Sequence, residues 1–460
     1  MIDCRWLLIA SLAACVQQNN SDVTVVRVDQ EPVGDNCQYG GVAVSSGIDS
    51  NHNGVLDDDE ITSTEYACNG GVTIRCAAGE SAIDGSVIVR DASEFAQLSG
   101  VNCIDGDLLI AGIAGEIPAL PDLSTVTGEV VVAGNPDLTT LDGLSGLRQI
   151  GQSYLVQGND SLDDISQIAD LDRVLSIFII GNNSLHDLAG LSSWDQITVS
   201  FDVSNNPALT SLHGLENVYT TKSWLAIRSN RSLTDLTALT NLRSAGVLDI
   251  SGNASLTALE LPNLEKVDTR LVVNQSPALT SVSLPKLVTL ADGIVFSGDP
   301  RLDTISMPAL LTTGVVTLEN DTLLTTVDAH SLQYATVDVN LTNLTALASA
   351  DFSSLKAIAG TLRVYYVSPF TFAGFGNLNT VGNLWLSAAG MTDFTGLSAL
   401  GSVAGNMSVI GCTQLADFTG LDAMTDIGGN LVLAGNPGIT TVEAQTFVNS
   451  VTIHGTVTIQ

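Results

Sequence analysis

A repeated unit of roughly 21–24 residues runs through most of this chain and constrains its fold more than any other feature. It is clearest at Gly128–Ile150, GEVVVAGNPDLTTLDGLSGLRQI, which follows G-x-h-x-h-x-G-N-x-x-L-x-x-L-x-G-L-x-x-L-x-x-I with h apolar. This length is typical of leucine-rich repeats, whose coils bury their apolar side chains only by stacking on one another. The repeat predicts a leucine-rich solenoid over residues 106–460.

One apolar residue that follows the repeat's asparagine marks each coil. We place this marker at Leu138, Leu162, Leu185, Leu209, Leu233, Leu256, Leu279, Leu302, Leu323, Leu344, Met391, Leu415 and Ile439. At the strand spacing of about 4.8 Å, about fifteen coils predict a mostly β, right-handed parallel β-helix of order 70 Å. Such short coils leave no room for a long helix in each repeat.

Asparagines in register predict a second ladder, made by Asn135, Asn159, Asn182, Asn206, Asn230, Asn253, Asn320 and Asn436. Because a buried turn leaves backbone groups that need partners, stacked amides would satisfy them from coil to coil. Asp299 and Cys412 fall in the same register, so we interpret Cys412 as a small buried substitute. Phe372, Phe394 and Phe418 predict a stacked core row near the C-terminal end.

The composition excludes some partners. The 460 residues carry 16 basic and 49 acidic side chains, a net charge of −33, and are 45% apolar. Phosphate binding needs clustered Lys and Arg, so nucleic acid and anionic lipid headgroups are not expected as partners. The apolar content argues against disorder.

The N-terminal residues indicate export. Arg5 precedes the apolar run Trp6–Ala14, which has the features of a signal peptide over residues 1–14. Leu12-Ala13-Ala14-Cys15 resembles the bacterial lipobox, and the resemblance implies that Cys15 carries a lipid anchor. The residues after it are polar and show no periodicity, so residues 15–36 are expected to form the anchor and a flexible tether. Val16 after that cysteine favours the outer membrane or cell surface.

A calcium loop is expected at Asp49–Glu60, DSNHNGVLDDDE, which matches the EF-hand pattern in full. Alternating oxygen donors and a closing glutamate suit a hard cation such as structural Ca²⁺. The expected ligands are Asp49, Asn51, Asn53, the carbonyl of Val55, Asp57 and Glu60. The flanks do not show two amphipathic helices, so a lone loop is expected; an acidic turn without metal is the alternative.

Four cysteines cluster around this loop. We favour the disulfides Cys37–Cys68 and Cys76–Cys103, although four cysteines allow three connectivities. Residues 37–71, with their GIDSNHNGVLDDDE loop and C-N-G exit, resemble a small cysteine-and-calcium module of bacterial surface proteins. The segment from Cys76 to Cys103 resembles the entry cap of receptor L-domains, and this resemblance implies that residues 72–105 cap the solenoid, with a short helix near Ala92–Leu98.

The residues from Cys76 onward resemble receptor L-domains and related leucine-rich surface repeats. The resemblance rests on the Cys76–Cys103 cap, C-I-D-G-D-L-L-I after it, and the G-x-L-x-I and L-x-x-L-x-G-L-x-x-L-x-x-I halves of each coil. It covers residues 76–460 and implies the fold; it names no ligand.

No motif for catalysis accompanies the repeat, and the five histidines are scattered. We therefore expect no enzymatic activity but a cell-surface lipoprotein that presents its solenoid to an unknown surface protein or glycan, in recognition or adhesion. The alternatives are a structural envelope protein without a specific ligand and a carbohydrate-active β-helix enzyme. Outward strand positions predict the contact surface: Val131, Leu155, Phe178, Trp224, Arg228, Arg363, Tyr365 and Trp385.

Overall fold

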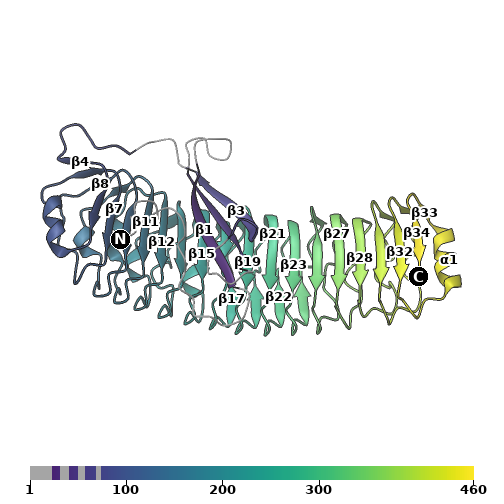
Figure 1. The fold of residues 1–460 in the computed structure, drawn as a ribbon. Coiled ribbons are helices and arrows are strands. Elements are labelled where there is room, and N and C mark those ends of the chain that lie inside the picture. The colour runs from purple at the N-terminus through teal and green to yellow at the C-terminus, as the bar shows by residue number, and fades with distance from the viewer. Residues whose placement is uncertain (1–22, 32–40, 50–56, 69–73) are drawn as a thin grey trace.

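The computed structural model describes residues 23–31, 41–49, 57–68 and 74–460. Figure 1 shows an elongated stack of short strands and a separate three-stranded sheet, which is formed by residues that precede the stack in the sequence. The stack is a parallel β-solenoid of about 16 turns, which confirms the fold class expected from the repeat.

The main ladder of the solenoid takes one strand from each coil, and every pairing in it is parallel. Its strands are β5 (Val87–Val89), β7 (Leu108–Ala111), β9 (Val130–Ala133), β11 (Ser153–Gln157), β12 (Ser176–Ile180), β14 (Ser200–Ser204), β15 (Thr220–Arg228), β16 (Ser244–Asp249), β19 (Arg270–Asn274), β21 (Thr289–Ser297), β23 (Thr312–Glu319), β26 (Val339–Thr342), β27 (Ala357–Tyr365), β28 (Thr380–Ser387), β30 (Met407–Ile410), β32 (Leu431–Ala434) and β34 (Val457–Ile459). Equivalent residues of successive coils thus lie side by side.

Two other sides complete each coil. Short strands before the main strand form a second parallel ladder, and where one long strand spans both ladders the register shifts at the corner between them. The separate strands of this ladder are β4 (Ala82–Asp84), β6 (Cys103–Asp105), β8 (Thr125–Val126), β10 (Gln149–Ile150), β13 (Gln196–Ile197), β18 (Lys266–Val267), β25 (Tyr334–Ala335), β29 (Ser402–Val403), β31 (Asp426–Ile427) and β33 (Thr452–Ile453).

The third side is more irregular. It carries the 3-10 turns η2 (Asp142–Leu144), η3 (Ser166–Asp170), η4 (Ala189–Leu191) and η5 (Thr237–Leu239), and mid-chain a short ladder of β17 (Ala258–Glu260), β20 (Ser281–Ser283), β22 (Thr304–Ser306) and β24 (Thr326–Asp328). The leucines of the repeat line the interior of all three sides, and Leu138, Leu144 and Leu147 are fully buried.

The corner after each main strand explains the asparagine ladder. A residue with positive φ comes first, Gly158 for example, and the next side chain points inward and is buried. Asn159 accepts a hydrogen bond from the backbone N–H of Asn135 on the preceding coil (3.1 Å), and its Nδ2 donates to the carbonyl of Val132 (3.0 Å). Each buried amide therefore satisfies backbone groups of the coil before it, as expected.

The ladder departs from the expected register in two coils. Asn320 has a φ of 60° and is exposed, so it occupies the left-handed corner position, and Asp321 is the buried residue. Leu324 rather than Leu323 is consequently the buried marker of that coil. In the next coil Leu344 itself fills the ladder position after Asn343, and Leu347 follows it as the marker.

Both ends of the solenoid carry capping features. The disulfide Cys76–Cys103 forms (Cα–Cα 5.6 Å), and the 3-10 helix η1 spans Ala92–Leu98, where the short helix was expected. At the other end lies α1 (Thr441–Ser450), an α-helix that the sequence analysis did not predict. Its Phe447 ring stacks on Phe418 (centroids 4.4 Å), which extends the phenylalanine row through Phe394 and Phe372.

The N-terminal sheet contains β1 (Val23–Glu31), β2 (Gly41–Asp49) and β3 (Ile61–Cys68), all antiparallel. The expected calcium loop thus connects two strands and not two helices. Glu60 is buried, and its Oε2 accepts a hydrogen bond from the backbone N–H of Asp57 (3.1 Å). Asn51, Asn53 and Val55 lie outside the described residues, as do Cys15 and Cys37, so the calcium site, the lipid anchor and the Cys37–Cys68 disulfide stay predictions.

Candidate binding surface on the main sheet

Alternation along the main strands divides their side chains between the core and the outside. In β27, Leu362 and Val364 are buried, whereas Arg363 and Tyr365 point outward. Because the ladder is parallel and in register, outward residues form rows that cross the coils. A central row passes through Asn340, Arg363 and Trp385, and an edge row beside it passes through Thr342, Tyr365 and Ser387.

The predicted contact residues of the N-terminal coils belong to these rows. Val131, Leu155 and Phe178 are direct neighbours in the central row, as expected. Val131 and Leu155 are half-buried, but Phe178 is buried. Only the first two therefore offer accessible apolar surface.

A compact cluster occupies the outward face of β14–β16. Arg228 stacks over the Trp224 ring, with its guanidinium carbon 4.7 Å from the ring centroid, and forms ion pairs with Asp202 and Asp249. Ala226 lies between Trp224 and Arg228 on the same strand and is fully buried. Trp224 and Arg228 are each only 8% exposed, which corrects the expectation that they present a contact surface. This cation is neutralised within the protein.

A second cluster combines Arg363 and Tyr365 of β27, Tyr366 directly after that strand, and Trp385 of β28; we call it the aromatic platform. The guanidinium carbon of Arg363 lies 4.3 Å from the Trp385 ring centroid. The Tyr365 and Trp385 rings are nearly parallel, with centroids 6.1 Å apart, and Tyr366 meets Tyr365 edge-on at 4.5 Å. The structure thus joins three predicted contact residues with one that the sequence analysis missed.

Tyr366 is an unusual residue for the corner position that it occupies. It occupies the left-handed corner with a φ of 52°, and its side chain is 54% exposed. Other coils place glycine or a small or polar residue there, as at Gly134 and Asn205. A left-handed conformation costs an ordinary residue roughly 1–2 kcal/mol, and such strain concentrates at functional sites. The repeat pattern could have revealed this residue, because an aromatic side chain replaces the corner glycine.

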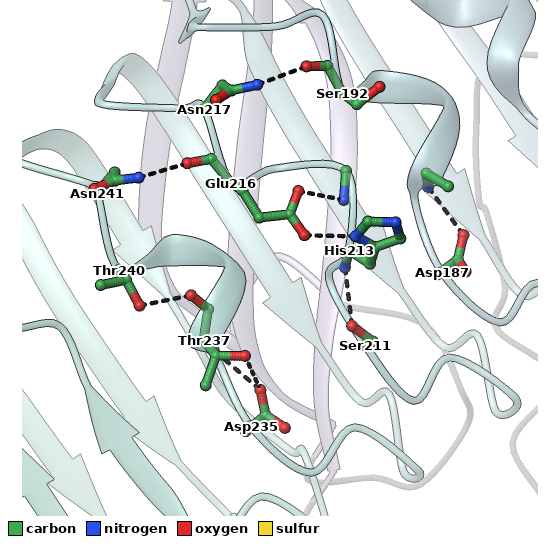
Figure 2. Close-up of polar contacts among 12 residues, drawn as sticks. Asp187, Ser192, Ser211, His213, Glu216, Asn217, Asp235, Thr237, Thr240 and Asn241 are labelled. Atoms are coloured by element: carbon green, nitrogen blue, oxygen red, sulfur yellow. Dashed lines mark hydrogen bonds and ion pairs between the residues drawn. The ribbon is translucent and has the colours of Figure 1, made fainter.

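Many carboxylates on the third side have a structural use (Figure 2). Asp187 and Asp235 accept hydrogen bonds from backbone N–H groups two residues later, and Thr237 lowers the pKa of Asp235 by hydrogen bonding to it. Asn217 and Asn241 donate to the carbonyls of Ser192 and Glu216 on the preceding coils. The acidic surface is therefore partly a set of turn-forming side chains.

The histidines of the solenoid pair with carboxylates. His213 binds Glu216 (2.6 Å), which raises the pKa of the imidazole, and His186 binds Asp163 (3.2 Å). Asp328, His330 and Asp351 bring three potential metal ligands within 4.8 Å, a group that the sequence analysis did not identify. Asp328 and Asp351 each already cap a local turn, so their proximity follows from the turn geometry.

Comparison with known proteins adds limited information. A family model described as a domain of unknown function, DUF7151, matches residues 24–68, which include all but the first residue of β1 and the whole of β2 and β3. No curated protein matches the chain. Among solved structures, a chain of the "Crystal structure of TLR13-ssRNA13 complex" is 12% identical, with a TM-score of 0.19 over 77% of this chain and 70% of that one. At that TM-score the match supports no inference about a ligand.

No helix within the described part of the chain is long and apolar enough to cross a membrane.

Proposed function

We propose that this chain is a non-catalytic recognition protein, held at the bacterial cell surface by a lipid on Cys15, whose solenoid binds its ligand at the aromatic platform. The observation that carries the proposal is the platform itself, in which successive contacts join Arg363 to Trp385, Trp385 to Tyr365 and Tyr365 to Tyr366 on an outward sheet face. Tyr, Trp and Arg are the residues most enriched at binding hot spots.

The arrangement of the platform supports binding more than folding. Arg363 and Tyr365 both contact the Trp385 ring, so the indole is fixed before a ligand arrives and loses little conformational freedom on binding. Tyr366 contributes exposed aromatic surface from a strained corner that glycine would occupy without strain. Strain of this kind is expected where a side chain serves recognition.

The variant Tyr366→Gly separates recognition from folding. We expect its melting temperature to equal or exceed that of the wild type, because glycine adopts φ 52° freely. Binding to a panel of surface proteins and glycans should weaken about tenfold, the loss of an aromatic contact of about 1.4 kcal/mol. The matched control is Ala388→Gly, which makes the same backbone change one coil further on (φ 49°) without altering the platform.

Equal ligand binding by Tyr366→Gly and the wild type would show that the aromatic platform is not the binding site. Loss of binding in both glycine variants would instead indicate that the corner backbone, and not the tyrosine ring, matters.

The proposed anchor has its own test. In the lipobox reading, Cys15 is the only residue that receives the lipid, so Cys15→Ser should abolish fatty-acid labelling and move the protein from the membrane to the soluble fraction. A Cys15→Ser protein that still takes up labelled lipid would exclude this anchor, whatever the platform binds.

A further inference from the structure

Arg363 is an uncompensated cation in a strongly acidic chain. The sequence holds 49 acidic and only 16 basic residues, yet no carboxylate of the described residues forms an ion pair with Arg363. Its Nε is buried and has no hydrogen-bond partner. Its row neighbours are Asn340 and Trp385, and the adjoining edge row supplies Thr342 and Ser387, which are all neutral. On the opposite flank Asp338 carries a carboxylate, which accepts a hydrogen bond from the backbone N–H of Thr361 (2.6 Å). Among the described residues, no ion pair therefore neutralises the charge of Arg363.

Arg228 shows how the same chain treats a comparable side chain that serves stability. Both arginines lie on the outward face of the main ladder, and both stack over a tryptophan at 4.3–4.7 Å. Arg228 is buried, and Asp202 and Asp249 from the flanking coils neutralise it. Arg363 has the aromatic partner without the carboxylates. The guanidinium of Arg363 therefore lacks an anionic partner within the described residues, and a ligand with a negative charge would supply one.

The surroundings of Arg363 restrict the class of ligand. Strand β27 pairs with β26 on one side and β28 on the other, so its backbone is not available to an added peptide strand, and side chains must carry recognition. The platform offers aromatic surface, while Asn340, Thr342 and Ser387 offer amide and hydroxyl groups. Aromatic surface bordered by such groups suits a sugar ring, which has an apolar face and a rim of hydroxyls.

The charge of the whole chain restricts the ligand further. Because the net charge is −33, the protein would repel a nucleic acid, which carries a phosphate on every nucleotide. Binding such a polymer would also need several clustered basic side chains on the protein. One carboxylate needs only one arginine, and Debye screening over about 8 Å limits repulsion from distant acidic residues.

We propose that the aromatic platform binds a carboxylate-bearing sugar residue of a surface glycan, in which Arg363 takes the carboxylate and the aromatic side chains pack against the ring. This inference rests on the proposed recognition function and specifies its ligand. A guanidinium fits a carboxylate with two parallel N–H···O bonds, so both the charge and the planar shape of Arg363 are used.

The test measures binding of the full-length protein to immobilised oligosaccharides that contain a uronic or sialic acid, and to the same oligosaccharides with that carboxyl reduced to an alcohol. An acidic peptide and a single-stranded oligonucleotide complete the probe set. The variant is Arg363→Gln, and the matched control is Arg301→Gln, which alters an exposed arginine and changes the net charge equally. Melting curves establish that both variants are folded.

The expected result is binding of the acidic oligosaccharide that falls about tenfold or more when the carboxyl is reduced or Arg363 is replaced, since a charged hydrogen bond contributes about that much. Arg301→Gln should retain wild-type binding. Equal affinity for the acidic and the reduced sugar would overturn the acidic-sugar assignment and leave recognition at the platform intact. Arg363-dependent binding of the peptide or the oligonucleotide alone would assign a different ligand class. Absence of binding to all probes would contradict the proposed function as well.

Discussion

At the scale of single residues, the corner of each coil restricts which side chains can occupy it. The buried position prefers asparagine because one amide both accepts a backbone hydrogen bond and donates another, as Asn206 does to the carbonyl of Ile179 (2.9 Å). The sequence located this ladder, and it located Cys412, which is buried there and whose backbone N–H donates a hydrogen bond to Oδ1 of Asn436 (2.8 Å). It misplaced Asn320, because asparagine also suits the left-handed corner one residue earlier.

Two ladder positions hold aspartates, and these are expected to make stability depend on pH. Asp299 and Asp321 each accept one backbone hydrogen bond through Oδ1, from Ser276 (2.6 Å) and Asp299 (2.8 Å), and leave Oδ2 buried without a partner. Burial raises the pKa of Asp299 to about 8 and that of Asp321 to about 7. A protonated carboxyl has a donor where asparagine has its amide, so the neutral form fits the site.

The folded chain therefore binds these two protons more tightly than the unfolded chain, whose aspartates titrate near 3.8. Stability from these groups is fully present below about pH 4 and is lost as the pH rises through about 7 and 8. We expect Asp299→Asn with Asp321→Asn to remove much of this decline and to add about 1–3 kcal/mol per site above pH 8, the cost of an unsatisfied buried acceptor. Thermal melting from pH 4 to pH 9 measures the effect.

The matched control for this pH series is Asp303→Asn, which removes an exposed carboxylate from the coil that contains Asp299. It should leave the slope of melting temperature against pH unchanged. An identical slope in the wild type and the double asparagine variant would show that Asp299 and Asp321 are not protonated in the folded protein.

At the scale of elements, the capping structures at the two ends of the solenoid differ in how well the sequence predicts them. The N-terminal cap was predictable because Cys76 and Cys103 match the two cysteines that flank a short helix in the entry cap of receptor L-domains, which this segment resembles. The helix α1 carries a signal that the repeat pattern obscured. Thr440 and Glu443 form a capping box in which Thr440 Oγ1 accepts from the Glu443 N–H (3.2 Å) and Glu443 Oε2 accepts from the Thr440 N–H (2.8 Å).

Secondary structure inside the coils followed from periodicity alone, while the surface clusters did not. Inward positions are predictable because every coil presents an apolar side chain to the same core. Outward positions follow no such pattern, so the sequence analysis predicted both Arg228 and Arg363 to be contact residues. Their environments differ because Asp202 and Asp249 come from coils on either side of Arg228, and only the register of β14–β16 brings them together.

At the scale of the whole molecule, a solenoid is nearly one-dimensional, because each coil contacts mainly its two neighbours. A destabilising substitution in one coil should therefore affect mainly that coil and its neighbours. Leu209 is fully buried near the middle of the chain, and Phe447 is buried in the C-terminal helix against Phe418. Replacing either with alanine should cost about 2–5 kcal/mol locally.

Hydrogen exchange detected by mass spectrometry measures how far each change spreads. We expect Leu209→Ala to speed amide exchange over the coils of β12–β16 and Phe447→Ala to speed it over β30–β34, with the N-terminal coils β5–β9 unaffected by Phe447→Ala. The two positions share no contacts, so the double variant should show the sum of the two patterns. If Phe447→Ala alone speeds exchange evenly from β5 to β34, the chain unfolds as one cooperative unit, and the nearest-neighbour description of this solenoid is wrong.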